Sequence, residues 1–523
     1  MMYKVITQDF GSRFFHEFGE ITKSMRKVCV MMDKSLEQVD YKGLFKYFSE
    51  ISKIPRGSGN EKAVSDYLVS FAKEHQLECT QDAANNVVMI KEATPGYEKE
   101  PAIILQGHMD MVCEKRKEYT HDFLKDEIKL ILEGDNLHAD GTTLGADDGM
   151  ALAYIMAMFT DDTLEHPRLE AVITTDEEVG MHGAKALDLS KLQGKYMINI
   201  DSEEEGYVLC SCAGGLTGTS TLPVKRVSSF GKKIKISIGG LLGGHSGMDI
   251  GRNRSNATKL LGRLLFDLRE TSSFGLIHMQ GGFKDNVIPR EAYAEIFISA
   301  KDTKELSEVY AGIEKNINEL LASYKKELSA SEPDMNDQIE DMGDDNYDVM
   351  HPSSFEKLLF LLVNMPNGVE VMSSDIEGLV ESSLNMGIFR TDADKVELFT
   401  SIRSSISSYK YHLSNKLNYM TSFLGGDYVV RWEYPAWEFK KDSLLREHCQ
   451  KWYRNLYGKD MKVEAIHAGL ECGLISEKIP GIDIVSIGPD ITAVHTIEER
   501  VSIASAIRVY QFLEKIITDK IGA

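Results

Sequence analysis

Cysteine is scarce in this sequence, with seven residues in a chain of 523, and no two of them form a CxxC pair. The seven are odd in number and scattered. This argues against a disulfide framework and against a zinc site built on thiolates. The pattern is typical of a reducing compartment, where most cysteines serve as small core residues.

Long apolar runs are also missing. No stretch approaches the ~18 to 20 residues of a membrane helix, and the apolar residues 28–32 are fewer than the ~7 to 15 of a signal-peptide core. Basic residues are outnumbered, with 59 Lys and Arg against 81 Asp and Glu, a net charge of −22. This charge opposes binding to nucleic acids and anionic membranes. We therefore expect a cytoplasmic protein with neither partner.

The composition suits a large folded core, because 42% of the residues are hydrophobic and 27% are charged. At roughly 150 residues per domain, the length allows about three domain-sized units. Residues 1–31 have no clear periodicity and precede an amphipathic helical pattern at residues 32–52. We interpret residues 1–31 as an N-terminal extension that could be a start-site artefact.

From residue 60 to about 213, helical patterns alternate with short apolar strands. The expected helices cover residues 60–75 and 149–159, and the expected strands cover residues 86–90, 102–106, 170–175 and 195–200. This alternation predicts an α/β fold with a mostly parallel sheet. The same style resumes at residue 442, so residues 32–214 and 436–523 are expected to form one domain.

Residues 215–435 follow a different pattern, which occurs twice. A strand, a helix, two strands and a helix are expected at 233–238, 254–269, 274–280, 292–299 and 306–324. A helix, two strands, a helix and a strand follow at 354–363, 382–389, 395–402, 411–423 and 427–434. We interpret this region as an inserted α+β domain of two similar halves. The acidic stretch between the halves (331–348) is expected to be a solvated connecting loop.

The strongest signal for chemistry is AIILQGHMDMV (residues 102–112). His108 and Asp110 directly follow a buried strand, and both side chains leave the same face if the extended geometry continues. Open α/β sheets bind ligands at the carboxyl ends of their strands. An isolated His-x-Asp is more often an ordinary surface loop, but other motifs of the same kind accompany this one.

Further motifs place acidic or imidazole groups at strand ends or at the start of a helix. They are Asp147 in LGADDGMA, Glu177 and Glu178 in TTDEEVG, Asp201 in MINIDSEEEG and His495 in DITAVHTIEERV. Each also has a simpler interpretation, such as a helix N-cap for the aspartates of LGADDGMA or a loop position for the histidine. Unpaired carboxylates in one cleft would repel each other strongly, and a bound cation removes this conflict.

The residue types indicate which metal would bind. Two imidazoles and several carboxylates without a thiolate suit zinc, with cobalt or manganese as substitutes. Three carboxylates (Asp147, Glu178 and Asp201) would reduce the four charges of two ions to +1, which a bridging hydroxide brings near neutrality. Ions about 3.5 to 4 Å apart need one carboxylate that spans both. These considerations favour two divalent ions.

These motifs resemble those of the M20 family of dinuclear zinc peptidases. DSEEEG (201–206) and HAGLECG (467–473) are similar to the aminoacyl-histidine dipeptidase (peptidase D) branch of that family. The resemblance covers nearly the whole chain after Met32. It implies that residues 32–214 and 436–523 form the catalytic domain and that residues 215–435 form a lid.

The resemblance also implies a role for each matching residue. One zinc would be bound by His108 and Asp201 and the other by Glu178 and His495, while Asp147 bridges the two ions. Asp110 would orient the imidazole of His108, and Glu177 would be the general base. The family usually has Ser-Pro after the last histidine ligand, whereas Thr and Ile follow it here.

Lid residues matched in the same way would contact the substrate. His245 in GGHSG would stabilise the developing oxyanion, although a buried lid-core histidine is the simpler interpretation. Asn286 in NVIP and Arg403 in SIRSS would hold the substrate and its C-terminal carboxylate, which suits a bidentate arginine. A surface salt bridge is the alternative for Arg403. Gly469 and Glu471 of HAGLECG are further candidates.

The resemblance thus implies a cytoplasmic metallodipeptidase that hydrolyses dipeptides such as aminoacyl-histidine. The alternatives within the family are a tripeptidase and an N-acyl amino acid amidohydrolase. A non-catalytic peptide-binding protein is the alternative from another class. The expected partner is a dipeptide substrate, and both a monomer and a homodimer are compatible with a lid of two halves.

Overall fold

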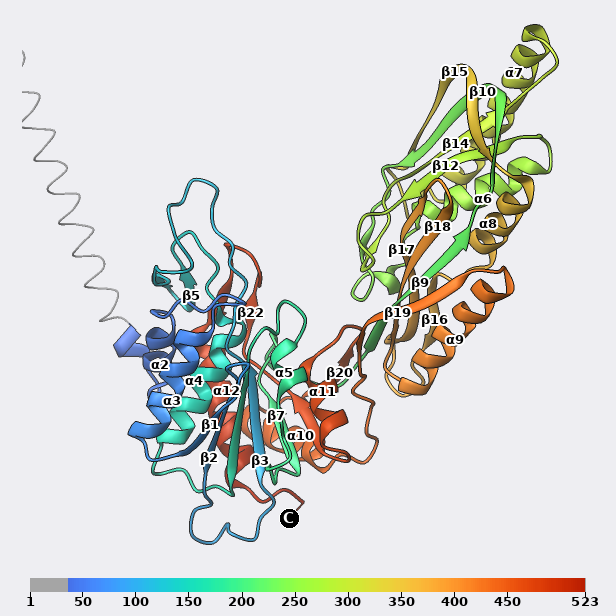
Figure 1. Cartoon of the computed structure of the whole chain (residues 1–523). Helices are drawn as coiled ribbons and strands as arrows, with labels where there is room; N and C mark the ends of the chain where they lie inside the picture. Colours follow the sequence, from blue (N-terminus) through green and yellow to red (C-terminus); the bar gives the residue numbers. More distant parts are fainter. Residues whose placement is uncertain (1–35, 523) are drawn as a thin grey trace, which may run out of the picture. The chain divides into compact units, whose positions relative to one another are not determined.

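The structure is a computed structural model that describes residues 36–522 (Figure 1). The predicted extension at residues 1–31 lies outside the described residues. The chain divides into two compact units. Of the described residues, the first unit contains 36–210, 440–464 and 478–522, and the second contains 211–439 and 465–477. Residues 465–477, which carry HAGLECG, thus group with the inserted segment.

An eight-stranded sheet lies at the centre of the first unit, in the order β1-β2-β6-β3-β7-β21-β8-β20. Its four middle strands are parallel to one another: β6 (Leu169–Thr174), β3 (Ile103–His108), β7 (Tyr196–Asn199) and β21 (Asp483–Ser486). The strands β1 (Glu78–Gln81), β2 (Val87–Lys91) and β8 (Tyr207–Cys212) pair antiparallel, and β20 (Lys462–Ile466) forms an edge. Every residue of β3 and β6 is buried, which explains why both strands are mainly apolar rather than alternating.

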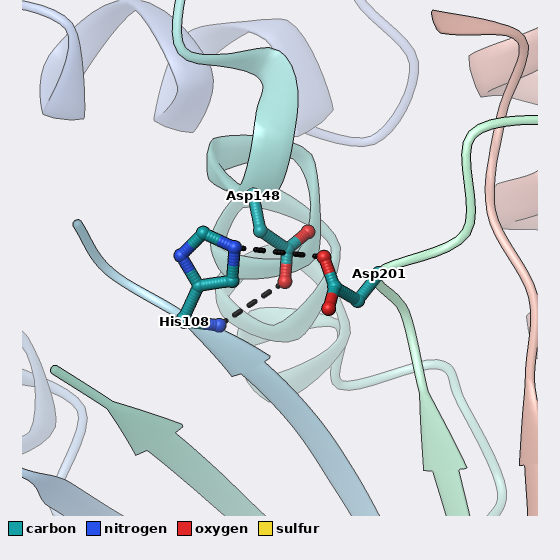
Figure 2. A group of neighbouring side chains, drawn as sticks. All are labelled: His108, Asp148 and Asp201. Carbon is teal, nitrogen blue, oxygen red and sulfur yellow. Dashed lines mark hydrogen bonds and ion pairs between the residues drawn. The ribbon is translucent and has the colours of Figure 1, made fainter. Parts of the chain in front are cut away.

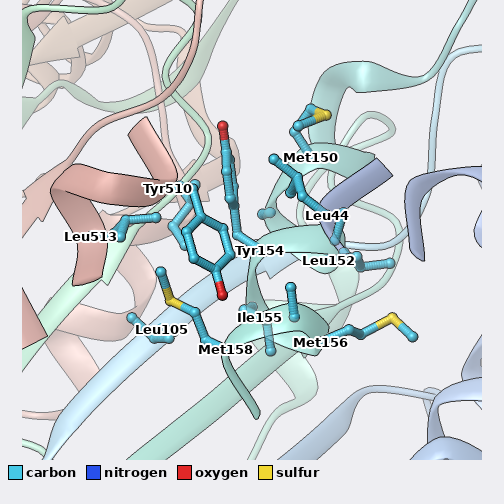
Figure 3. Packing of buried hydrophobic residues seen from close by; sticks show 14 of the residues in the cluster. Leu44, Leu105, Met150, Leu152, Tyr154, Ile155, Met156, Met158, Tyr510 and Leu513 are labelled. Atoms are coloured by element: carbon cyan, nitrogen blue, oxygen red, sulfur yellow. The ribbon is translucent and has the colours of Figure 1, made fainter. Parts of the chain in front are cut away.

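The helix α4 (Ala146–Thr160) is buried on nearly all sides. Its sequence GMALAYIMAMF has no polar face, as expected of a helix enclosed by other elements. It packs against β3, α2 (Leu44–Ile51) and α12 (Ile503–Thr518). Figure 3 shows Tyr154 of α4 beside Tyr510 of α12, and the Tyr154 hydroxyl donates a 2.9 Å hydrogen bond to the Ala506 carbonyl. Further helices of this unit are α3 (Lys62–Glu74), α5 (His182–Ala186) and α10 (Leu444–Tyr457).

The single helix predicted over residues 32–52 is wrong for its described part. A short helical turn covers residues 36–39, this turn ends before Asp40, and α2 begins only at Leu44. The Asp40 carboxylate accepts hydrogen bonds from the backbone N–H groups of Gly43, Phe45 and Lys46. The aspartate therefore ends one helix and caps the next, which an amphipathic pattern does not reveal.

A small sheet joins two distant parts of the first unit. It has the order β22-β23-β5-β4. Its strands are β22 (Ile491–Thr492), β23 (Arg500–Ser502), β5 (Asn136–Ala139) and β4 (Leu130–Glu133). The turn that carries His495 lies between β22 and β23 and is anchored at both ends by this sheet.

The second unit contains a nine-stranded sheet in the order β15-β10-β14-β12-β17-β18-β9-β19, with β16 paired to β17. Four helices, α6 (Ala257–Arg269), α7 (Thr303–Glu327), α8 (Pro352–Asn364) and α9 (Ser407–Phe423), share one hydrophobic core with it. The strands are β9 (Gly214–Pro223), β10 (Arg226–Gly239), β12 (Gly275–Gly281), β14 (Ala292–Ile298), β15 (Asn336–Met350), β16 (Gly368–Met372), β17 (Val380–Thr391), β18 (Lys395–Ser404) and β19 (Asp427–Tyr434).

The strand order of this sheet is almost the same from either edge. One half contains β15, β10, β14 and β12, and the other contains β19, β9, β18 and β17 in matching places. The two halves join where β12 pairs with β17. The first strand of the second half, β9, precedes the whole first half in sequence. For this reason the sequence repeat begins with a helix in its second copy.

The acidic stretch 331–348 is not the connecting loop that we predicted. Most of it forms β15, which pairs antiparallel with β10 from Arg226↔Met350 to Gly239↔Asn336. Lys232 of β10 contacts Asp341 at 2.8 Å and Asp344 at 2.9 Å. An edge strand exposes much of its surface, so it does not need apolar alternation, and its acidic side chains discourage pairing with other chains.

Two further features of the described residues bear on the sequence predictions. The described cysteines, residues 79, 113, 210, 212, 449 and 472, are free thiols. Among residues 36–522, no helix combines the length and apolar character needed to cross a membrane.

The core of the second unit generates a stability prediction. Ile236 of β10 is fully buried, whereas Val227 on the same strand is 49% exposed. Ile236→Ala should lower the free energy of unfolding of this unit by about 2 to 5 kcal/mol, and Val227→Ala should change it by less than about 0.5 kcal/mol. Urea unfolding followed by tryptophan fluorescence measures both in a Trp452→Phe background, where the two remaining tryptophans report on the second unit. Equal effects would contradict the burial of Ile236.

Candidate functional site

Three neighbouring parallel strands bring candidate residues to one edge of the first unit's sheet. His108 is the last residue of β3, Glu177 and Glu178 follow β6, and Asp201 follows β7. Because β6, β3 and β7 are adjacent and parallel, their carboxyl ends share one edge. The fold therefore accounts for the meeting of side chains that lie far apart in sequence.

Two turns complete this cluster. Asp147 lies at the start of α4 with non-helical φ/ψ of −81° and 110°, so its side chain leaves from a turn, and its peptide bond to Asp148 is cis. His495 has φ 61° in the turn between β22 and β23. The seven residues that we predicted from the catalytic domain lie together in this unit: His108, Asp110, Asp147, Glu177, Glu178, Asp201 and His495.

The carboxylate of Asp147 lies between the two imidazoles. Its Oδ1 is 3.1 Å from Nε2 of His108, and its Oδ2 is 3.0 Å from Nε2 of His495. Asp201 Oδ1 is 3.5 Å from the same nitrogen of His108, and Glu178 Oε1 is 2.9 Å from that of His495. The cluster thus consists of two imidazole–carboxylate pairs that share one central carboxylate.

Asp148 also lies against this cluster but points toward the backbone. Figure 2 shows it with His108 and Asp201, and its Oδ2 accepts a 3.1 Å hydrogen bond from the His108 backbone N–H. Its other oxygen is 3.4 Å from the Ala151 N–H in the first turn of α4. The side chain therefore ties β3 to the helix. Gly107 leaves room for it, since a Cβ there would lie 2.4 Å from Asp148 Oδ2.

The carboxylate of Asp110 is fully buried behind His108. It lies 3.3 Å from Nδ1 of His108, on the opposite side of the ring from Asp147. It also accepts hydrogen bonds from the Ser58 hydroxyl at 2.8 Å and from the backbone N–H groups of Glu177 (3.1 Å) and Glu178 (3.3 Å). Asp110 therefore connects the ends of β3 and β6 and orients the imidazole.

The crowding of charge shifts the protonation of the cluster. Burial opposes the charge of His108, but hydrogen bonds to neighbouring carboxylates outweigh it and raise its pKa well above the ordinary value. Contacts with Asp147 and Glu178 raise the pKa of His495 to about 10. Burial, together with repulsion from Asp147 and Glu178, raises the pKa of Asp201 to about 6. The carboxylates thus keep the two imidazoles protonated, and their mutual repulsion favours the protonated form of Asp201.

This donor set fits a divalent metal ion. His108, Asp147 and Glu178 each offer a ligand atom within 4.8 Å of the others, and so do His108, Asp148 and Asp201. Nitrogen and oxygen donors without a thiolate are a normal ligand set for first-row divalent ions. An ion would replace the protons that now balance the negative charge.

Two buried charged residues near the cluster were not identified from the sequence. Arg56 donates hydrogen bonds to the backbone carbonyls of Met109 and Asp110 at 3.0 and 3.2 Å, and also to that of Gly145. Glu499 accepts hydrogen bonds from four backbone N–H groups at residues 144–147. The available signals were the PRGSGNE segment between two helices and a glutamate four residues after His495.

The five other predicted residues, His245, Asn286, Arg403, Gly469 and Glu471, all belong to the second unit. His245 lies on β11 (Gly244–His245), which pairs with β13 (Val287–Ile288) and so places GGHSG beside Asn286. Nδ1 of His245 accepts from the backbone N–H groups of Gly247 and Met248, both at 3.2 Å. This ring therefore carries its proton on Nε2. Burial and the positive charge of Arg403 lower the pKa of His245, which favours the neutral ring.

Arg403 and Asn286 line the same pocket of the second unit, which has a volume of about 610 Å³. The guanidinium is 8% exposed, its Nη1 donates a 3.0 Å hydrogen bond to the Tyr434 hydroxyl, and its Nε has no hydrogen-bond partner among the described residues. No described carboxylate forms an ion pair with it, so the surface salt bridge that we considered is not formed. A buried guanidinium in this state is suited to an anionic ligand.

HAGLECG borders this pocket through Tyr434. A Cβ at Gly469 would lie 2.7 Å from the Tyr434 ring, so the close approach requires glycine. Glu471 is fully buried at the start of α11 (Glu471–Lys478). His467 is buried 2.7 Å from the Ser383 hydroxyl, and burial together with the charge of Arg403 lowers its pKa to about 3. The motif therefore supplies a neutral imidazole near the arginine and a glycine packed against Tyr434.

An imidazole–carboxylate cluster at the carboxyl edge of a parallel α/β sheet is characteristic of metal-dependent hydrolases. The chain belongs to peptidase family M20/M25/M40, whose family model matches residues 104–519. It is 35% identical to the cytosol non-specific dipeptidase of Escherichia coli over 487 residues, covering 92% of this chain and 99% of that protein.

Solved structures agree with this assignment. The aminoacylhistidine dipeptidase of Vibrio alginolyticus superposes with a TM-score of 0.83 at 34% identity, covering 91% of this chain and 98% of that one. A tripeptidase of Staphylococcus aureus gives a TM-score of 0.52 at 17% identity, covering 91% and 97%, and shares the fold alone. The predicted α/β fold and the predicted family are confirmed.

The contacts of Asp110 generate a prediction about metal binding. Asp110→Asn keeps the shape of the side chain but removes the charge that faces Nδ1 of His108. We expect the dissociation constant for Zn²⁺ to rise about 10- to 100-fold, because partners of ligand histidines typically contribute that much. Competition with a chromophoric chelator measures it. A variant that binds Zn²⁺ as tightly as the wild type would remove Asp110 from this role.

Proposed function

We propose that this protein is a cytoplasmic, metal-dependent dipeptidase that hydrolyses dipeptides such as aminoacyl-histidine. The observation that carries the proposal is the position of Asp147, whose two oxygens face His108 and His495 separately. A single carboxylate between two imidazole–carboxylate pairs is what a two-ion site requires. The names of the two most similar relatives described above, both dipeptidases, support the choice of substrate.

In this proposal the first unit holds two divalent ions, zinc or else cobalt or manganese. His108 and Asp201 would bind one ion, Glu178 and His495 the other, and Asp147 both, which agrees with the contact pairs in the cluster. When bound, such ions polarise a carbonyl and lower the pKa of water. The remaining steps depend on the side chains of this chain.

Glu177 is the proposed general base. It lies beside Glu178 in the turn after β6, and its backbone N–H donates a 3.1 Å hydrogen bond to the Asp110 carboxylate. The two glutamates lie in a hydrogen-bonded turn after β6. Glu178 contacts His495 at 2.9 Å, so in this proposal Glu178 binds metal and Glu177 faces the substrate. Glu177 would take a proton from the attacking water and return it to the leaving amine.

We propose that residues 215–435, in the second unit, form a lid. This lid would supply the other contacts to the substrate. His245 carries its proton on Nε2 and is suited to donate a hydrogen bond to the oxyanion as it develops. Arg403 would bind the C-terminal carboxylate of the dipeptide in the pocket that Asn286 also lines. Gly469 would act through its contact with Tyr434 of that pocket, and Glu471 is a further candidate of the same motif. A requirement for a free carboxylate would exclude N-acyl amides that lack one.

Replacement of the base tests the chemical step. Glu177→Ala should lower kcat on dipeptides by about 10²- to 10⁴-fold with unchanged metal content, because the ligands remain. Glu165→Ala, in an exposed loop before β6, is the matched control and should match the wild type. Chelation should abolish wild-type activity, and Zn²⁺, Co²⁺ or Mn²⁺ should restore it. Near-normal turnover of Glu177→Ala would exclude it as the base.

Replacement of the proposed carboxylate anchor tests substrate recognition. Wild-type protein should hydrolyse dipeptides at least about 100-fold more efficiently than their C-terminal amides, since a buried charge-assisted pair is worth about 3 kcal/mol. Arg403→Met should lose most of this preference, chiefly through KM for the free dipeptide. Arg390→Met, whose guanidinium pairs with Glu397 on the surface, should retain it. A panel that includes tripeptides and N-acetyl amino acids separates the alternatives within the family.

A further inference from the structure

We propose that Glu499 and Arg56 form a buried clamp that positions the central carboxylate Asp147. Both are positioning residues, since neither side chain touches the imidazoles of the cluster. The inference rests on the proposed function and deepens it, because it identifies what fixes the carboxylate shared by the two ions.

The Glu499 carboxylate binds the backbone of the turn that ends in Asp147. Its Oε2 accepts from the N–H groups of Leu144 at 2.7 Å and Gly145 at 2.9 Å. Its Oε1 accepts from those of Ala146 at 2.7 Å and Asp147 at 3.3 Å. Four consecutive N–H groups thus converge on one side chain that is 3% exposed.

The turn depends on this side chain because it is irregular. Gly145 has φ 70°, and Asp147 has non-helical angles inside the first turn of α4. The N–H groups of such a segment have no helical or strand partners of their own. Without the carboxylate, four donors would be buried and unpaired, each at a cost of about 1 to 3 kcal/mol.

Arg56 holds the same turn from the other side. Its guanidinium donates to the carbonyl of Gly145, whose N–H is bound by Glu499, so this one residue is held at both ends. It also donates to the carbonyls of Met109 and Asp110, which directly follow His108. Arg56 thereby fixes the Asp147 turn relative to the strand end that carries the first imidazole.

The contact between Arg56 and the Asp147 turn requires glycine at position 145. A Cβ on Gly145 would lie 2.6 Å from Nη2 of Arg56 and 2.7 Å from Sδ of Met111. The glycine therefore allows both the positive φ and the close approach of the guanidinium.

The clamp contains two buried side chains of opposite charge, and each is stabilised in the interior by its surroundings. Burial raises the pKa of Glu499 and lowers that of Arg56, which reflects the cost of each charge alone. Hydrogen bonds from backbone N–H groups of the turn oppose the shift at Glu499. Attraction to Glu499, and also to Asp110 and Asp148, opposes the shift at Arg56. Removal of Glu499 would take away the largest of the attractive contributions at Arg56 and so raise the cost of burying its charge.

Glu499 also connects the clamp to the second imidazole. It lies four residues after His495, and the next residue begins β23 in the small sheet. The turn bearing His495 and the turn bearing Asp147 are thus joined through one side chain. A shift of Glu499 would move Asp147 relative to both His108 and His495.

The test compares Glu499→Gln with Glu498→Gln in the full-length protein. The amide of Gln offers one acceptor oxygen in place of two and places an NH₂ group against backbone donors, while Glu498 is 57% exposed and outside the clamp. We expect Glu499→Gln to weaken Zn²⁺ binding about 10- to 100-fold and to change the visible absorption of the Co²⁺-loaded protein. Glu498→Gln should match the wild type in both measurements.

A second variant serves as the control for misfolding. Glu499→Asp keeps the charge opposite Arg56 but retracts it by one methylene, so the protein should keep its wild-type circular dichroism and still bind Zn²⁺ at least about 10-fold more weakly. Wild-type affinity and Co²⁺ spectrum in folded Glu499→Asp would overturn the clamp. If the wild-type protein itself bound no divalent metal and hydrolysed no dipeptide, the proposed function would fail first.

Discussion

Repulsion among buried carboxylates is the constraint on which the first unit depends. Asp147, Glu178 and Asp201 converge on two imidazoles at the carboxyl edge of the sheet. In the structure, some of the carboxylates near this site bind backbone N–H groups and others face the imidazoles. Backbone N–H groups donate hydrogen bonds to the carboxylates of Asp110, Asp148 and Glu499. The carboxylates of Asp147, Glu178 and Asp201 face the imidazoles.

The second unit addresses the opposite electrostatic problem. Arg403 is buried without an ionic partner among the described residues, and the groups around it, His245 and His467, are kept neutral by its charge and by burial. The Tyr434 hydroxyl supplies a neutral acceptor for one guanidinium nitrogen. A buried guanidinium without a carboxylate partner bears the desolvation cost of its charge alone, and an anionic ligand such as the one proposed above would offset that cost.

Much of the first unit could be predicted because its central strands are largely buried. The expected ranges for β2, β3, β6 and β7 lie within one or two residues of the structure, and their carboxyl ends located the candidate residues. β15 was missed because an acidic edge strand has no apolar alternation. Arg56 and Glu499 were missed for another reason: their partners are backbone atoms, which leave no complementary pattern of side chains in the sequence.

The place of β9 in the sheet has a consequence for the way the protein is made. Nearly all of its residues are buried between β18 and β19, yet β9 ends at Pro223, β18 begins only at Lys395 and β19 at Asp427. At about 5 to 20 residues per second of translation, this strand emerges roughly 10 to 40 seconds before its neighbours exist. A nascent chain therefore carries an unsatisfied sheet edge while the first half assembles beside it. Chaperones that shield such an edge would matter most during that interval.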